Sequence, residues 1–222
     1  MAREIIEEQY KINAFTYPLC PIVTESPNLE VANWGLIPSW TKTIDEAKKV
    51  RTMCLNARAE TVFEKPTFRT SILSKRCLIP ATGYFEFHHT TDKNAVPYYI
   101  YLPNEEIFSI GGMYEKWQNP ATKEIVQTFT ILTVPANELC REVHNGGKNP
   151  FRMPLIIEHE KESIWLDKTQ KNTGIQQFFQ PYDADKMDAY PVSEDFLKKQ
   201  PDDPTIIERT AKKNYQPMRL FQ

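Results

Sequence analysis

The sequence predicts an α+β fold built on an antiparallel sheet, in a single domain. Strand signals gather between residues 76 and 135, short helical patterns lie on either side of them, and neither a repeat nor a low-complexity linker divides the chain. With 222 residues, 41% of them hydrophobic, the chain can bury a large core. We therefore expect one domain over residues 1–222.

The expected elements follow from the local patterns in chain order. An amphipathic helix is expected over 1–13, and residues 14–40 are aromatic and interrupted by proline. A short helical pattern covers 42–50. The strands, which are β-branched or aromatic and bounded by turn residues, are expected at 77–79, 84–87, 98–101, 108–113, 128–134 and 155–157. Helices are expected at 136–143, 160–167 and near 173–180, and the polar tail from about residue 197 is expected to be loosely held.

Charge and composition exclude several classes of protein. The net charge of −2 gives no global attraction to nucleic acid, so a DNA-binding face must be a local cluster of Arg and Lys. No apolar run approaches the ~20 residues of a membrane span, and the first residues lack a signal-peptide core. The four cysteines are scattered without a Cys-x-x-Cys pair, so the sequence predicts neither a zinc site nor a disulfide framework. This pattern favours a location in the reducing cytoplasm.

Glu86 is the most informative single residue. It lies in a predicted strand and is flanked by Tyr84, Phe85 and Phe87. Burial beside aromatic rings disfavours the charged form of a carboxyl and raises its pKa. Since an unpaired buried carboxylate costs stability, its presence calls for a reason. A carboxyl with a raised pKa is suited to general acid/base catalysis.

A second candidate segment is Asn56-Ala-Arg-Ala-Glu-Thr61. If it is extended, Asn56, Arg58 and Glu60 share one face. An arginine beside an amide can clamp a phosphate and orient a polar substrate. The alternative is a surface salt bridge with a turn asparagine.

Three further side chains qualify as site residues. His144 ends a predicted helix before a Gly-rich loop, where an imidazole can shuttle protons or contact a phosphate, although a lone histidine can equally be hydrogen-bonded in place. Trp40 precedes a polar segment and is a candidate platform for stacking nucleobases. We expect His88 and His89 to face solvent. Candidate phosphate contacts come from Arg58, Arg69, Lys75, Arg76 and Arg152.

Taken together, these segments resemble the SRAP (SOS response-associated peptidase) domain family of abasic-site processing proteins. The resemblance covers about residues 17–193, and each block is weak alone but six occur in the family's order. The matching blocks are Trp34–Trp40, Asn56–Thr61, Arg76–Phe87, Phe129–Asn137, His144 with Arg152–Pro154, and Pro191–Ser193.

The resemblance implies a curved, barrel-like antiparallel sheet with flanking helices. It implies binding of single-stranded DNA that carries an abasic site, by a cytoplasmic, nucleoid-associated monomer without cofactor or metal. In the family, an N-terminal cysteine attacks the sugar aldehyde: its amine forms a Schiff base and its thiol closes a thiazolidine, which leaves a DNA–protein crosslink. Lyase and autopeptidase activities are also attributed to the family.

The resemblance also assigns roles to residues. Asn56 would hold the N-terminal residue and the linkage, Glu86 would be the general acid/base, and His144 would contact the sugar and assist strand cleavage. Phosphates would be bound by Arg58 and Arg152, while Trp40 would stack near the lesion. Thr133 matches a hydroxyl in the wall of the family's site.

Two departures from the family pattern matter. The family begins Met-Cys-Gly-Arg, whereas this chain begins Met1-Ala2-Arg3, so the expected nucleophile is missing. This suggests that Met1 is an internal methionine taken as the start; a Schiff base from the Ala2 amine is the remaining route to covalent chemistry. The loop between His144 and Arg152 is also longer than in the family.

Three hypotheses for the function follow. The first is an abasic-site processing protein that forms a covalent crosslink when its N-terminal cysteine is present. The second is a single-strand DNA-binding module that has lost the chemistry. The third is a Cys–His hydrolase that pairs Cys54 or Cys140 with His144, for which the sequence offers no oxyanion hole.

Overall fold

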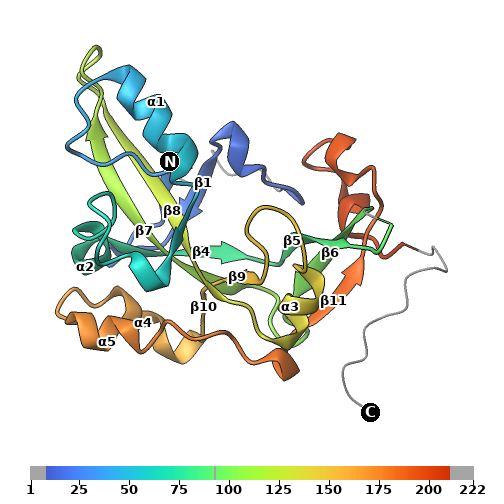
Figure 1. Cartoon of the computed structure of the whole chain (residues 1–222). Helices are drawn as coiled ribbons and strands as arrows, with labels where there is room; N and C mark the ends of the chain where they lie inside the picture. The colour runs from blue at the N-terminus through green and yellow to red at the C-terminus, as the bar shows by residue number, and fades with distance from the viewer. Residues whose placement is uncertain (1–8, 93, 211–222) are drawn as a thin grey trace.

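The computed structural model describes residues 9–92 and 94–210 and contains two β-sheets with short helices around them (Figure 1). The α+β class is confirmed. The expected helix over 1–13 falls mostly outside the described residues, and residues 9–13 are not helical.

The larger sheet has eight strands. Its main path runs β1-β2-β8-β7-β10, while β3 and β9 pair with β8 and β4 pairs with β7. The strands are β1 (Leu19–Ile22), β2 (Glu30–Trp34), β3 (Asn56–Arg58), β4 (Arg76–Ala81), β7 (Phe108–Gln118), β8 (Ile125–Pro135), β9 (Arg152–Pro154) and β10 (Ile156–Ile157). Most pairings are antiparallel as predicted, but β2 and β3 run parallel to β8. The sheet is curved and does not close into a barrel (Figure 1).

The smaller sheet has the order β11-β6-β5 and carries the strand that holds Glu86. Its strands are β5 (Tyr84–His89), β6 (Ala95–Tyr101) and β11 (Asp188–Pro191). An aromatic cluster on one side of this sheet packs Phe85 against Phe196, with ring centroids 4.8 Å apart. The burial of Phe196 packs the start of the C-terminal segment against the smaller sheet.

The tail is folded as far as Thr210. It contains the 3₁₀ turns η6 (Phe196–Lys198) and η7 (Pro204–Ile207), and the side chains of Phe196 and Ile206 are buried. Val192 and Arg209 form a β-bridge. Residues 197–210 are therefore held by the smaller sheet, and the rest of the expected loose tail, 211–222, lies outside the described residues.

The helices are short and surround the sheets. They are α1 (Ile44–Met53), α2 (Ser71–Ser74), α3 (Glu138–Val143), α4 (Glu162–Leu166) and α5 (Asn172–Gln176), with 3₁₀ turns η2 (Ala14–Thr16), η3 (Ala59–Thr61), η4 (His159–Lys161) and η5 (Ala184–Lys186). In Figure 1, α4 and α5 lie below the large sheet, and α1 lies beside the β7–β8 hairpin. The capping box between Thr43 and Glu46 explains where α1 begins. Within the described ranges, no helix has the length and apolar character needed to cross a bilayer.

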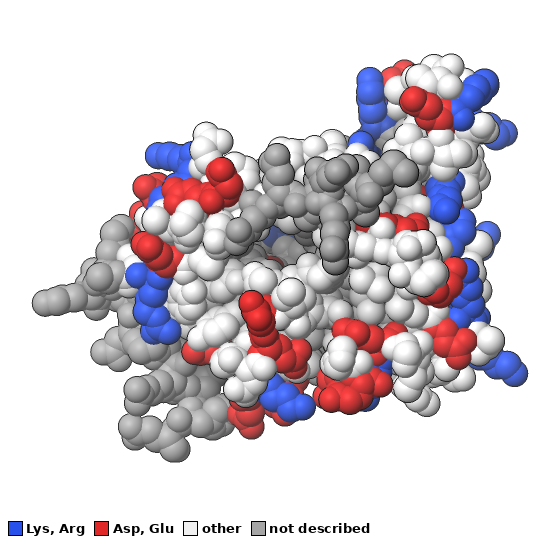
Figure 2. Space-filling model, turned by 180° about the vertical axis from the view of Figure 1, so that it is seen from behind, with Lys and Arg blue, Asp and Glu red and all other residues white. Residues whose placement is uncertain are grey.

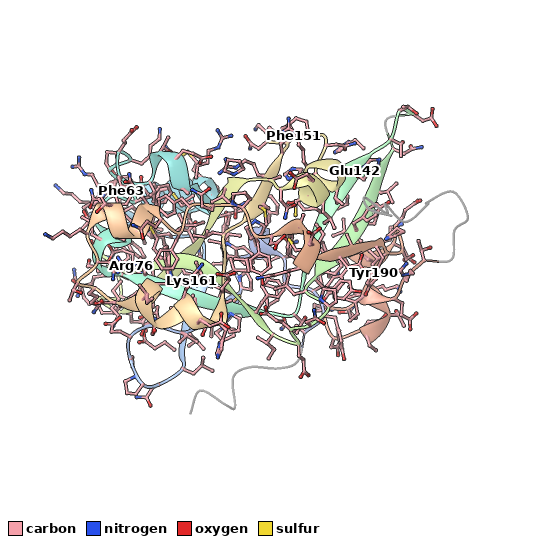
Figure 3. The ribbon with its side chains drawn as sticks, turned by 90° about the horizontal axis from the view of Figure 1, so that it is seen from below. Phe63, Arg76, Glu142, Phe151, Lys161 and Tyr190 are labelled. Atoms are coloured by element: carbon pink, nitrogen blue, oxygen red, sulfur yellow. The ribbon has the colours of Figure 1, made fainter. Side chains whose placement is uncertain are left out.

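Arg76 corrects one expectation. We predicted that it contacts phosphate, but its residue is only 2% exposed. Its guanidinium donates to the backbone carbonyls of Trp165 (2.6 Å) and Ile72 (2.7 Å), and Figure 3 shows it lying inside the molecule. Arg76 therefore joins α4 to β4. The backbone oxygens that accept its hydrogen bonds offset the desolvation cost of burying its charge. Lys75 is likewise occupied, in an ion pair with Glu115.

Candidate active site

Glu86 and His144 meet at the junction of the smaller sheet and α3. Glu86 lies on β5, and His144 is the residue that ends α3. His144 Nδ1 is 3.4 Å from Glu86 Oε1, and the side chains are 17% and 25% exposed, respectively. Both groups are therefore partly desolvated but still reachable from solution, as proton transfer to a bound substrate requires.

A backbone carbonyl decides which nitrogen of His144 carries the proton. His144 Nδ1 lies 3.0 Å from the carbonyl oxygen of Arg152, and that oxygen can only accept a hydrogen bond. Nδ1 therefore carries hydrogen in the neutral ring. The lone pair of the neutral imidazole is left on Nε2, for which the described residues provide no hydrogen-bond partner and which can accept a proton from a substrate.

The surroundings of Glu86 raise its pKa. Burial is the largest cause, because it penalises the carboxylate, while His144 and the backbone amide of Phe87 act in the opposite direction. The sequence expectation of a carboxyl with a raised pKa thus has its physical basis in the structure. Glu86 is suited to exchange a proton nearer neutrality than an exposed glutamate.

Arg152 links this pair to the large sheet. Its guanidinium donates to both carboxylate oxygens of Glu60, with 3.0 Å between Nη2 and Oε2. Nη2 also lies 2.7 Å from the backbone oxygen of Thr133 and 3.1 Å from its hydroxyl. Arg152 Nε is buried and has no hydrogen-bond partner among the described residues. The predicted phosphate ligand is thus held in place and largely neutralised by Glu60, whose own pKa is lowered by Arg152.

Arg58 lies on the neighbouring strand. β3 pairs in parallel with β8, with Arg58 opposite Thr133, and the exposed–buried–exposed pattern of β3 puts Asn56 and Arg58 on one face. Arg58 donates a hydrogen bond of 2.8 Å from Nη2 to Oδ1 of Asn149. The two arginines, Thr133 and His144 therefore belong to one connected group.

Two predicted site residues lie outside this group. Asn56 shares the face of Arg58, but among the described residues no hydrogen bond joins its side chain to Glu86 or His144. Trp40 is 57% exposed. Its neighbour Thr41 accepts a hydrogen bond from Trp117, close to the turn of the β7–β8 hairpin. Trp40 therefore lies toward the hairpin, and its stacking role remains a prediction.

The sequence did not reveal three residues that support the site. Glu60 was seen as a candidate but not as the partner of Arg152, and Asn149 was part of an unassigned loop. Asn145 donates to the backbone oxygen of His89 (3.0 Å) and accepts from its amide (2.7 Å). The only sequence signal for the 145–151 loop was the set of polar residues on either side of Gly146 and Gly147.

The two histidines of β5 also correct an expectation. We predicted that they face solvent, but both are partly buried. His88 Nδ1 lies 2.9 Å from the carbonyl oxygen of Glu142, and the His89 backbone bonds to Asn145. They fasten β5 to the end of α3 and so hold Glu86 next to His144.

All four cysteines are buried, which weighs against the hydrolase hypothesis. Burial raises the pKa of the Cys54 thiol to about 11 and that of Cys140 to about 12. Cys140 Sγ lies 3.1 Å from the hydroxyl of Tyr84. A protonated, enclosed thiol is a poor nucleophile, so neither candidate cysteine suits a Cys–His pair.

Elsewhere the structure offers a groove without comparable chemistry. It has a volume of about 590 Å³ and is lined mainly by the segments around α4 and α5, including Ile157, Phe178 and Tyr182. No group of three or more His, Cys, Asp and Glu side chains arranged to hold a metal ion is present in the part of the chain that the structure describes. The Glu86–His144 pair is therefore the better candidate for catalysis.

The face seen in Figure 2 carries no broad patch of positive charge. In Figure 2, Lys and Arg gather mainly along one edge and Asp and Glu lie mainly over the lower middle, and neither sign covers the described part of that face. Phosphate binding would have to rely on a few positioned arginines.

Comparison with protein families identifies the class of protein to which this fold belongs. The family model described as "SOS response associated peptidase (SRAP)" matches residues 2–198, so the chain belongs to the SRAP family. The resemblance noted in the sequence is thereby confirmed.

Known relatives agree with this assignment. The chain is 38% identical over 222 residues to "Abasic site processing protein YoqW" of Bacillus subtilis, covering 91% of this chain and 93% of that protein. It is 28% identical to "Abasic site processing protein HMCES" of Xenopus tropicalis, covering 63% and 45%. A crystal structure of a Bacteroides thetaiotaomicron protein superposes with a TM-score of 0.90 at 46% identity, covering 94% of this chain and 88% of that one.

Proposed function

We propose that this protein binds single-stranded DNA at an abasic site and performs acid/base chemistry on the exposed sugar. The observation that carries the proposal is the contact between Glu86 and His144, beside Arg58 and Arg152. Relatives named abasic site processing proteins support DNA with such sites as the partner. We also propose that the protein is a monomer and acts in the cytoplasm.

The chemistry proposed for the pair starts from the closed sugar. An abasic deoxyribose is a hemiacetal, and its ring opens when the C1 hydroxyl loses a proton and the ring oxygen gains one. Glu86 and Nε2 of His144 are the groups available for these transfers. An amine then adds to the aldehyde, and loss of water gives a Schiff base.

The thiol of a thiazolidine cannot come from the four cysteines of this sequence. A thiazolidine takes its nitrogen and its sulfur from one cysteine with a free α-amine, whereas the nitrogens of Cys20, Cys54, Cys77 and Cys140 are peptide amides. Burial also raises the pKa of each thiol. A stable thiazolidine crosslink therefore requires a cysteine that this sequence does not contain. Capture as a Schiff base by a chain amine requires no thiol.

A gel experiment separates the covalent from the non-covalent proposals. The protein is mixed with a labelled abasic oligonucleotide, or with the intact strand, and resolved in SDS with and without cyanoborohydride. A band that needs cyanoborohydride indicates a Schiff base, and a band that survives SDS without it indicates a more stable linkage. A shift seen in native gels alone supports the second proposal, non-covalent binding. No shift of either oligonucleotide would overturn both.

A further inference from the structure

Phe151 has a backbone conformation that bulky residues rarely adopt. Its φ is +62°, in the left-handed region that costs a side chain with a Cβ. Two hydrogen bonds hold it there: its amide donates to the carbonyl of His144 (2.8 Å), and its own carbonyl accepts from the amide of Ala136 (3.0 Å). The strained residue is thus fastened directly to the catalytic candidate His144.

The ring of Phe151 is presented to solvent although it is apolar. The residue is 39% exposed, and the Arg141 guanidinium carbon lies 4.7 Å from the ring centroid. In Figure 3, Phe151 lies at the rim of the molecule near Glu142 of α3. The ring is exposed, contacts Arg141 and belongs to a residue with a strained backbone. Neither core packing nor backbone preference explains this placement, which is typical of a binding contact.

The loop that carries Phe151 is anchored at both ends and in the middle. Asn145 makes two hydrogen bonds to the backbone of His89, and a Cβ added to Gly146 would lie 2.5 Å from the His89 ring. Gly147 has φ +84°, and Asn149 accepts from Arg58. The 145–151 loop is therefore bonded to Arg58 through Asn149 and to His144 through Phe151.

We propose that Phe151 is a stacking subsite for the nucleobase next to the abasic nucleotide. The inference rests on the proposed function, since it needs the lesion sugar at Glu86 and His144. A strand that lacks one base leaves the adjacent base without its stacking neighbour, and an aromatic ring can replace it. Stacking on an aromatic side chain tolerates any sequence, because every base has a π-face.

The test uses oligonucleotides with a tetrahydrofuran abasic analogue and a single 2-aminopurine at successive positions on either side. The wild-type protein is expected to quench 2-aminopurine emission at one flanking position, where Phe151 stacks. Phe151→Ala should restore that emission and weaken binding about 5- to 150-fold. Phe151→Tyr and Phe151→Trp should retain both effects.

Two further variants guard against misfolding and non-specific loss. Phe151→Gly removes the ring and also relieves the left-handed strain, so it should fold and still lose quenching. Leu73→Ala removes an apolar side chain of α2 that is also 39% exposed, and this variant should bind like the wild type.

The outcomes distinguish this inference from the proposed function. If the wild type binds the abasic strand but Phe151→Ala and Phe151→Gly bind within twofold with unchanged emission, the subsite is rejected and the function stands. Equal weakening on intact and abasic strands without a position-specific change in emission also rejects it. If the wild type binds neither strand, the proposed function fails and the subsite falls with it.

Discussion

Glu86 and His144 lie 3.4 Å apart although they come from different layers of the fold, a β-strand of the smaller sheet and the end of a helix that follows the longest hairpin. The hydrogen bonds of His88 and His89 to the residues that flank His144 keep the two elements in register. The Glu86–His144 pair therefore depends on how the smaller sheet packs against α3.

Glu86→Gln tests the acid/base role. The amide keeps the shape of the carboxyl but cannot exchange a proton, so borohydride-trapped adduct should form about 10²- to 10⁴-fold more slowly. Binding of the uncleavable tetrahydrofuran strand should stay within about twofold. Quenched-flow trapping measures the rate, and an unchanged rate would remove Glu86 from the mechanism.

The stability of Glu86→Gln relative to the wild type should depend on pH. Because burial raises the pKa of Glu86 in the folded state, its contribution to stability is present below its ordinary pKa and is lost as pH rises through the raised value. Glutamine does not titrate. The variant should therefore match the wild type near pH 4 and gain stability relative to it by pH 8. Urea unfolding across this range measures the difference, and a constant difference would show that Glu86 is not destabilised by its surroundings.

Arg58→Ala should weaken binding of every single-stranded DNA by about 1.5–3 kcal/mol, the scale of a charged hydrogen bond. The slope of log affinity against log salt should also fall by about 0.7, the value for one phosphate on a single strand. Fluorescence anisotropy gives both quantities. Lys171→Ala, which removes an exposed positive charge at the start of α5, is the matched control. Equal effects of the two variants would mean that Arg58 acts only through net charge.

Glu60→Gln should strengthen DNA binding. The carboxylate occupies the Arg152 guanidinium and repels phosphate, so its neutralisation frees the arginine for a phosphate. The cost to folding should be about 1–3 kcal/mol, because the Arg152 side chain is only 15% exposed and loses its charged partner. Anisotropy and thermal unfolding check the two effects. Weaker binding would show that Glu60 serves to position Arg152 and does not compete with DNA for it.

Cys140→Ser should leave adduct formation unchanged, because the thiol is buried and faces Tyr84. The hydroxyl can replace the sulfur as a partner for the tyrosine, which limits the loss of stability. A large fall in activity without loss of fold would return the Cys–His hydrolase to consideration.

The strands rich in aromatic and β-branched residues could be predicted because their signal is local. Glu86 stood out for the same reason, as a carboxyl among rings. The strands β1 and β2 were missed because prolines interrupt this part of the sequence: Pro18 and Pro21 at β1, and Pro27 shortly before β2. Pro21 is nevertheless accommodated within β1 itself. The sequence pattern also placed Arg76 on the surface, since only the folded chain brings Trp165 to it.

Contacts between distant segments lay beyond the sequence. Glu60 and Arg152 are separated by 92 positions, and Arg58 and Asn149 by 91. No local pattern specifies such partners, because they are set by the parallel pairing of β3 with β8 and the antiparallel pairing of β9 with the same strand. The tautomer of His144 likewise depends on the backbone carbonyl of Arg152, which only the folded chain brings next to the imidazole.

The burial of all four cysteines has a practical consequence for spectroscopy. Each thiol is enclosed and its pKa is raised, so alkylating reagents should label the folded protein slowly. A single cysteine introduced at exposed Ile107, which has no role in the proposed site, would then be the preferred attachment point for a fluorophore. The native chain is thus already a low-background host for distance measurements along a bound strand.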